Sequence, residues 1–263
     1  MTIRVLGCSG GIGGRQARTT SLLLGSDTLI DAGTGVGDLS VDELLAIDRI
    51  FVTHSHLDHI CSIPLLIDTV RQSRHTPVVV YALQATIDSL RKHIFNWTIW
   101  PDFSVIPSVE QPSVCFVPVA LGEQVHLPGG AVITVLPAAH VVPAVGYQID
   151  SGEASLVYTG DTTVNSALWP CVNGIGNLRH LIIECAFNQG EQALAQVSCH
   201  LCPEMLAQEL RCLERPVQVH VTHLKPGEAG QTIDEIDKTL HELSPRATIE
   251  NVQLLRRGQV LEL

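Results

Sequence analysis

Aromatic and charged residues are scarce in this chain of 263 residues, at 4% and 16%, whereas apolar residues make up 45%. No window holds 18 uninterrupted apolar residues, so we expect no membrane-spanning helix and no membrane partner. The first residues lack a charged segment followed by a long apolar run, so we expect no signal peptide and a cytoplasmic location. The length and apolar content suit one large α/β domain over residues 1–263.

Positively charged residues are also few. The chain has 16 Lys and Arg and 27 Asp and Glu, which gives a formal net charge of −11. Proteins bind long nucleic acids mainly through Lys and Arg that neutralise phosphates, and the chain has no dense basic run. We therefore expect no long RNA or DNA partner. A small anionic substrate stays compatible with this charge, because bound metal ions would reverse the field locally. The mean hydropathy of +0.24 indicates extra apolar surface, and we expect a homodimer.

The eight cysteines have no disulfide-framework spacing, so we expect reduced thiols. Cys199 and Cys202 form a lone C-x-x-C. A redox or zinc site is the less favoured interpretation of this pair, and two buried inert thiols are the favoured one. The others are expected to fill the core: Cys8, Cys61, Cys115, Cys171, Cys185 and Cys212.

The densest cluster of reactive side chains is His54-x-His56-x-Asp58-His59. Residues 49–53 before it are predicted to form a short buried strand, and a strand that enters a ligand-rich loop presents a metal site on a rigid scaffold. Alternate residues of an extended chain point the same way, so His54 and His56 can share one metal. Asp58 and His59 lie where the chain turns, and they can face a second metal.

Three more candidate ligands, His140, Asp161 and His223, each follow an apolar strand. Side chains at the exits of neighbouring strands meet at one edge of a sheet. With the first cluster they make seven N and O ligands, which suit two divalent metal ions, zinc first, with iron or manganese as alternatives. Two such metals, about 3.5 Å apart, lower the pKa of a bridging water and clamp phosphoryl oxygens.

Strands and helices alternate in two halves of the chain, which predicts a layered sandwich with two sheets inside and helices outside. The predicted strands are 3–6, 20–24, 28–31, 49–53, 78–82, 114–119, 124–127, 131–137, 145–149, 155–159, 181–184 and 217–222. The predicted helices are 39–47, 60–71 with an early break at Pro64, 83–95, 203–213 and 233–243, and residues 252–259 are expected as the arm of a closing hairpin.

The ligand pattern resembles that of the metallo-β-lactamase superfamily, and within it the class II 3′,5′-cyclic-nucleotide phosphodiesterases. The resemblance is carried by His-Ser-His-Leu-Asp-His-Ile at residues 54–60, by residues 93–103, by Cys-His-Leu-Cys-Pro at 199–203 and by Thr-His-Leu-Lys-Pro at 222–226. It implies an αββα sandwich of the metallo-β-lactamase type, with two mixed sheets flanked by helices. It also implies that His54, His56 and His140 hold one metal, that Asp58, His59 and His223 hold the other, and that Asp161 bridges them.

The same resemblance implies a dinuclear phosphodiesterase that hydrolyses 3′,5′-cyclic nucleotides, cyclic AMP first, to 5′-nucleotides through a metal-bridging hydroxide. Asp58 and His200 are the candidate catalytic residues. The alternative for His200 is a structural histidine that caps the helix beginning at Pro203. Two other functions remain open: an RNA-processing hydrolase like the tRNA 3′-end endonucleases, and an iron-dependent redox enzyme on the same scaffold.

Several further side chains can support such a site. Asp31 can orient a ligand histidine, and Glu184 is either a similar support or a solvated strand end. His220 is expected to be structural. Residues 95–103 are expected to form an interface or lid, with a base pocket as the alternative and a core role less favoured. The remaining histidines are expected at the surface or in loops: His75, His93, His126, His180 and His241.

Overall fold

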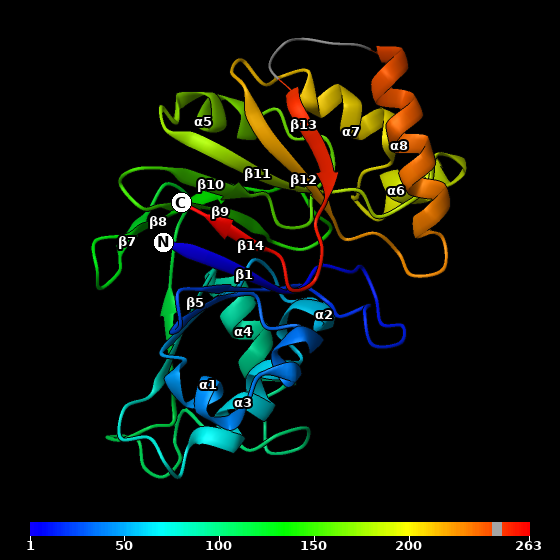
Figure 1. Ribbon diagram of the computed structural model, residues 1–263. Helices are drawn as coiled ribbons and strands as arrows, with labels where there is room; N and C mark the ends of the chain where they lie inside the picture. The colour runs from blue at the N-terminus through cyan, green and yellow to red at the C-terminus, as the bar shows by residue number, and fades with distance from the viewer. Residues whose placement is uncertain (244–248) are drawn as a thin grey trace.

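The computed structural model describes residues 1–243 and 249–263, and its strands form two mixed seven-stranded sheets that face each other (Figure 1). The first sheet has the order β14-β1-β2-β3-β4-β5-β6, with β1 (Thr2–Gly7), β2 (Ser21–Leu24), β3 (Thr28–Ile30), β4 (Arg49–Phe51), β5 (Val78–Ala82), β6 (Val114–Pro118) and β14 (Val260–Glu262). The second has the order β13-β12-β11-β10-β9-β8-β7, with β7 (Gln124–His126), β8 (Val132–Pro137), β9 (Val145–Asp150), β10 (Ser155–Tyr158), β11 (Leu178–Glu184), β12 (Val217–Thr222) and β13 (Ile249–Leu254).

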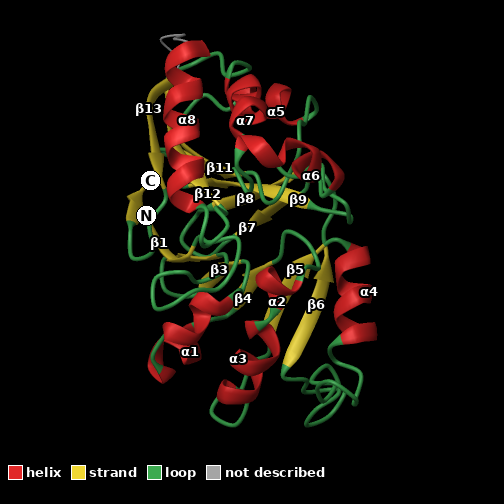
Figure 2. Cartoon of the chain, turned by 90° about the vertical axis from the view of Figure 1, so that its right-hand side faces the viewer, coloured by secondary structure: helices red, strands yellow, loops and turns green. Residues whose placement is uncertain are grey.

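Helices lie outside the two sheets, which gives the predicted αββα order of layers (Figure 2). On the side of the first sheet are η1 (Thr34–Asp38), α1 (Val41–Ala46), α2 (Leu57–Ile60), α3 (Ser62–Val70) and α4 (Gln84–His93). On the side of the second sheet are α5 (Leu168–Gly174), η2 (Gln189–Glu191), α6 (Gln192–Val197), α7 (Pro203–Leu210) and α8 (Ala229–Leu243). In the part of the chain that the structure describes, none of these helices has the length and apolar character needed to cross a bilayer.

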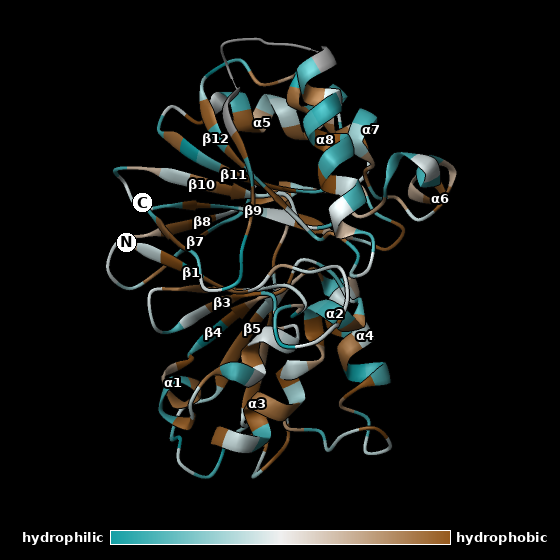
Figure 3. Ribbon diagram, turned by 45° about the vertical axis from the view of Figure 1, so that its right-hand side comes forward, coloured by the Kyte–Doolittle hydropathy of each residue, from teal (hydrophilic) through white to brown (hydrophobic). Residues whose placement is uncertain are grey.

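Three apolar layers hold the sandwich together, and the strands that separate them are apolar along most of their length (Figure 3). One layer lies between the first sheet and its helices, where Ile50 packs with Leu66. Another lies between the second sheet and its helices. The third lies between the sheets, where the rings of Phe51 and Tyr147 meet edge to face at 5.7 Å. Strands buried on both faces explain why these segments read as almost continuous apolar runs.

The helix expected over residues 60–71 is divided at Cys61 into α2 and α3, and Pro64 lies in the first turn of α3, where a missing N–H costs no helical hydrogen bond. One predicted detail at the end of the chain is wrong. The C-terminal strands form no hairpin, because β13 pairs with β12 and β14 pairs with β1 in the other sheet. Each strand completes the edge of a different sheet. The chain crosses between the sheets at residues 255–259, with Leu255 buried in the layer between them. Two short helices, α5 and α6, had not been predicted.

Some predicted exposures are also wrong. His180 is buried rather than at the surface, and its Nδ1 lies 3.1 Å from Nε2 of His220. Cys171 and Cys212 are exposed instead of filling the core, and none of the eight cysteines, all of which lie in the described residues, forms a disulfide. In the aromatic segment, Phe95 and Phe103 belong to the core under the first sheet. Trp97 in the same segment is 66% exposed, which leaves this part available for contacts.

Candidate metal centre

After β4, the chain turns toward α2, and the first ligand cluster lies on this turn. His54 comes three residues after the end of β4 and is fully buried. His56 is the extended residue before α2, and Asp58 lies in the first turn of that helix. A carboxylate there is favoured by the partial positive charge of the helix N-terminus. The connection from β4 to α2, together with the first turn of α2, therefore carries four candidate ligands.

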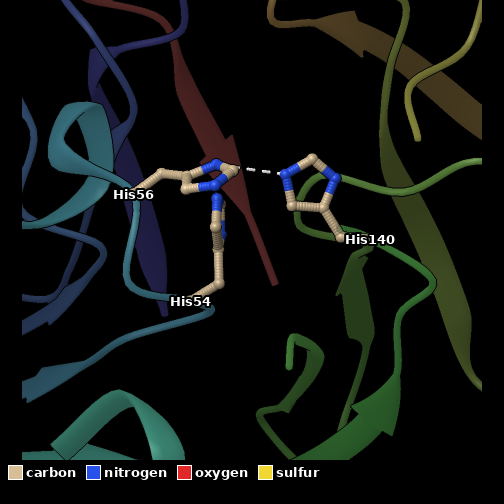
Figure 4. A group of neighbouring side chains, drawn as sticks. All are labelled: His54, His56 and His140. Carbon is tan, nitrogen blue, oxygen red and sulfur yellow. Dashed lines mark hydrogen bonds between the residues drawn. The ribbon is translucent and has the colours of Figure 1, made fainter. Parts of the chain in front are cut away.

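His54, His56 and His140 form one group, in which the three candidate ligand atoms all lie within 4.8 Å of one another. Figure 4 shows the imidazoles converging, with His140 approaching from the opposite side to His54 and His56. His140 Nε2 lies 3.1 Å from His56 Nδ1. Two nitrogens bound to one tetrahedral zinc at 2.0–2.1 Å would be roughly 3.3 Å apart. The observed spacing is close to that value.

Asp58, His59, Asp161 and His223 form the second group. Asp161 Oδ2 lies 3.3 Å from His59 Nε2 and 3.1 Å from His223 Nε2. The same oxygen is 3.8 Å from His54 Nε2 of the first group. His223 Nε2 is also 3.3 Å from Asp58 Oδ2. The structure thus brings all seven predicted ligands together, and Asp161 lies between the two groups.

Most of these histidines have one ring nitrogen engaged by the surrounding protein. His54 Nδ1 lies 3.0 Å from Thr53 Oγ1, and His140 Nδ1 lies 2.9 Å from the carbonyl oxygen of Cys199. His59 Nδ1 lies 2.7 Å from Asp31 Oδ2. Such partners fix the tautomer and the direction of the ring, and they leave the second nitrogen for a metal.

The predicted supporting role of Asp31 agrees with its contacts. Asp31 is fully buried, and its carboxylate accepts hydrogen bonds from the backbone N–H and the hydroxyl of Thr53 as well as contacting His59. It thereby couples the end of β4 to α2. The contact of His140 with the carbonyl oxygen of Cys199 was not predicted. Every residue has a backbone carbonyl, so the residue type does not indicate which carbonyl will be the partner.

The two groups differ in charge. Burial lowers the pKa of His54 well below its usual value and also lowers the pKa of His56 and His140, so these imidazoles stay neutral and keep a lone pair for a metal. Burial has the same direction at His223, but the Asp161 carboxylate outweighs it and raises the pKa of His223 to about 9. Burial opposes ionisation of Asp161, yet His223 and His59 hold its pKa well below the usual range.

The buried polar atoms at the centre fit divalent metal ions. Among the described residues, His54 Nε2, His59 Nε2 and Asp161 Oδ1 are buried without a hydrogen-bond partner. Unsatisfied buried polar atoms are costly, and the two imidazole nitrogens lie 3.8 Å and 3.3 Å from Asp161 Oδ2. Neutral imidazoles and ionised carboxylates are the ligands that zinc, iron and manganese accept. The His and Asp groups can therefore hold divalent metals.

His200 lies beside both groups, and its ring nitrogens have different surroundings. Its Nδ1 is 2.6 Å from Glu184 Oε1, and it shares further candidate ligand groups with His140 and Asp161 and with Glu184 and His223. Glu184 is fully buried at the end of β11 and is not a solvated strand end. Its carboxylate also accepts backbone N–H bonds, from Thr162, Ala186 and Leu201. His200 does not cap α7, since that helix has no side-chain cap.

The lone C-x-x-C contributes no thiol to the centre. None of the candidate metal groups found in residues 1–243 and 249–263 contains a cysteine. Cys202 is buried just before α7, and burial raises the pKa of its thiol. His220 is fully buried and contacts His180 rather than the metal groups.

Two facing sheets with outer helices define an αββα protein, and seven His and Asp side chains between its secondary-structure elements or in α2 form a candidate metal centre. A family model described as the beta-lactamase superfamily domain matches residues 27–241, and the chain belongs to this superfamily.

Curated relatives bear the name that the sequence resemblance implied, so that resemblance is confirmed. A 3′,5′-cyclic-nucleotide phosphodiesterase of Aliivibrio fischeri is 27% identical in an alignment that covers 84% of this chain and 80% of the relative. One from Schizosaccharomyces pombe is 24% identical in an alignment that covers 81% of this chain and 68% of the relative. Together with the fold, these relatives indicate a hydrolase of the superfamily.

Solved structures share the fold. Unliganded yeast PDE1 superposes with a TM-score of 0.81 at 18% identity, covering 100% of this chain and 99% of the other. The metallo-beta-lactamase fold protein YhfI from Bacillus subtilis gives 0.75 at 20% identity, covering 99% and 98%. The short form of human tRNase Z gives 0.65 at 17% identity, covering 100% and 99%. At these identities the likeness establishes the architecture.

Proposed function

We propose that this protein is a dinuclear metal-dependent phosphodiesterase that hydrolyses 3′,5′-cyclic nucleotides, cyclic AMP first, to 5′-nucleotides. The observation that carries the proposal is the position of Asp161. Its Oδ2 faces His54 of one group and His59 and His223 of the other, at 3.1–3.8 Å. A carboxylate in that position can bridge two metals, and two-metal centres of this kind serve phosphoester hydrolysis.

His54, His56 and His140 would hold one metal, Asp58, His59 and His223 would hold the other, and Asp161 would contact both. Zinc is the first candidate, with iron or manganese as alternatives. Bound in these groups, two divalent ions supply Lewis acidity to the phosphoryl oxygens and lower the pKa of coordinated water. The relatives named as cyclic-nucleotide phosphodiesterases support this substrate class.

His200 would give a proton to the departing ribose 3′ oxygen. Its Nδ1–H donates to Glu184, so its Nε2 is the nitrogen left for the substrate. The contact with the Glu184 carboxylate fixes the direction of the His200 ring. Asp58, hydrogen-bonded to His223, stays ionised because its pKa is lowered, and it would help to hold the second metal beside the substrate.

The test is turnover of cyclic AMP and cyclic GMP by zinc-loaded protein beside a His56→Ala control. Cyclic AMP turnover at least 100-fold above the control is expected, with a 5′-nucleotide as product. Precursor tRNA is the competing substrate in the same series. Efficient tRNA cleavage without cyclic-nucleotide turnover would contradict the proposal, and so would equal rates for wild type and the His56→Ala variant.

A further inference from the structure

Two buried carboxylates hold the loop that carries Asp161. At the start of the loop, Glu184 Oε1 accepts a hydrogen bond from the backbone N–H of Thr162 at 3.0 Å. Four residues after Asp161, Glu209 Oε2 accepts a hydrogen bond from the backbone N–H of Asn165, also at 3.0 Å. Glu209 comes from near the end of α7 and is 4% exposed. The loop is therefore fixed from two separate elements of the second half of the sandwich.

The same oxygen of Glu209 has a second donor. Trp169 Nε1 lies 2.9 Å from Glu209 Oε2, and Trp169 is buried in the core between the second sheet and its helices. Because both donors reach one oxygen, an amide oxygen in its place can keep both hydrogen bonds. An apolar side chain can keep neither. Burial raises the pKa of Glu209, so a neutral side chain suits the site.

Asn165 also joins the Asp161 loop to the segment that carries His140. Asn165 Nδ2 donates to the carbonyl of Pro137 at 2.9 Å, three residues before His140. Two more hydrogen bonds link the same segments, from Thr163 N to Ala139 O at 2.8 Å and from Ala139 N to Thr162 Oγ1 at 3.0 Å. Three hydrogen bonds therefore join the two ligand segments, and the Asn165 side chain supplies one of them.

We propose that Glu209 and Asn165 are positioning residues that set the distance between the two metal-binding groups. His140 belongs to one group and Asp161 to the other, and Glu209 belongs to none of the candidate metal groups found among the described residues. The hydrogen bonds of Asn165 connect the segments of both ligands, and Glu209 anchors Asn165 to α7. This inference rests on the two-metal centre of the proposed function.

The test compares Glu209→Leu with Glu209→Gln in the full chain. Zinc per chain is measured by mass spectrometry after dialysis against chelator-buffered zinc, and thermal unfolding is followed in parallel. In Glu209→Leu, the affinity for the weaker-bound metal is expected to fall by about 10- to 100-fold, as for other residues that orient metal ligands. Glu209→Gln is expected to restore two metals per chain, because its amide oxygen can accept both hydrogen bonds.

Trp169→Phe is the matched control, since it removes the other donor to the same oxygen and leaves Asn165 bonded. It is expected to lower Tm without changing zinc affinity. The inference is overturned if Glu209→Leu and Trp169→Phe lower Tm alike while both retain wild-type zinc affinity.

If Glu209→Leu does not fold, Asn165→Ala decides. It keeps the backbone N–H that Glu209 binds and loses only the bond to Pro137, and its zinc affinity is expected to fall in the same way. Unchanged zinc affinity in Asn165→Ala overturns the inference. If wild type binds two metals but hydrolyses no cyclic nucleotide, the proposed function fails, and the zinc measurements still decide the role of Glu209.

Discussion

His200 Nδ1 lies 2.6 Å from Glu184 Oε1, and the two side chains are almost completely buried beside the candidate metal groups. A short contact between an imidazole and a carboxylate is a charge-assisted hydrogen bond, stronger than a neutral one. Glu184 is itself held by three backbone N–H groups, so it cannot turn away from His200. This contact fixes the direction of the His200 ring, which suits the proton-donor role proposed for it.

We therefore predict that His200→Gln lowers kcat for cyclic AMP by about 10²- to 10⁴-fold, the usual range for loss of a general acid. Metal content should not change. An aryl diester such as bis(p-nitrophenyl) phosphate has a leaving group that needs no proton, so its kcat should fall much less. Equal losses for both substrates would show that His200 does not act as the acid.

Replacing Asp161 should affect both metals. Asp161→Asn removes the charge that faces both groups, so zinc content should fall from two to at most one per chain and turnover should fall by more than about 100-fold. Mass spectrometry of dialysed protein measures the metal directly. Asp68→Asn, a partly exposed carboxylate paired with Arg71, is the control for loss of one charge. Retention of two metals in Asp161→Asn would refute the bridging position.

Gly10 is predicted to be intolerant of a side chain. A Cβ at this position would lie 2.3 Å from the backbone oxygen and 2.7 Å from Nδ1 of His223. Gly10→Ala should destabilise the fold by about 1–3 kcal/mol, the usual cost of overpacking, and it should reduce zinc occupancy by displacing His223. Gly37→Ala enters open space and serves as the control. Thermal unfolding and zinc content of the two variants should differ clearly. Identical values would contradict the close approach.

The buried pair of His180 and His220 predicts a loss of stability in acid. Burial and the neighbouring His180 lower the pKa of His220 to about 4. The unfolded chain, with a histidine pKa of about 6.5, then binds more protons than the folded chain between these values. The free energy of unfolding should fall as pH drops from about 6.5 to 4, by at most about 3 kcal/mol for this residue.

Urea unfolding of wild type and His220→Gln from pH 4 to 8 measures this dependence. The variant should show a shallower decrease than wild type below pH 6.5. His93→Gln, which removes an exposed histidine, controls for the loss of one imidazole. Parallel pH curves for wild type and His220→Gln would contradict the prediction.

The ligand set was predictable from the sequence because its signals are local. His54, His56, Asp58 and His59 fall in one short turn, and a strand that runs into a helix fixes where they point. His140, Asp161 and His223 could be added because each follows an apolar strand, and strand exits meet at the edge of a sheet. The αββα order followed in the same way, from the alternation of apolar strands and helices in two halves.

The supports of the site were less visible, because they depend on contacts between distant segments. Asp31 and Glu184 drew attention as polar residues at strand ends, but a fully buried Glu184 bound to His200 required the fold. Glu209 gave no signal, because a carboxylate within α7 resembles any solvated residue of a helix. The burial of His180 was also missed, because its partner His220 lies 40 residues further along the chain.

The sequence by itself determined the αββα order of layers and which side chains are candidate metal ligands, since both follow from residue type and short-range periodicity. Tertiary structure alone decided that β13 and β14 complete different sheets. It also decided that Glu184 and Glu209 hold the Asp161 loop. Packing of the two sheets brings these residues together. Their hydrogen bonds join segments that are far apart in the chain, so no local sequence pattern predicts them.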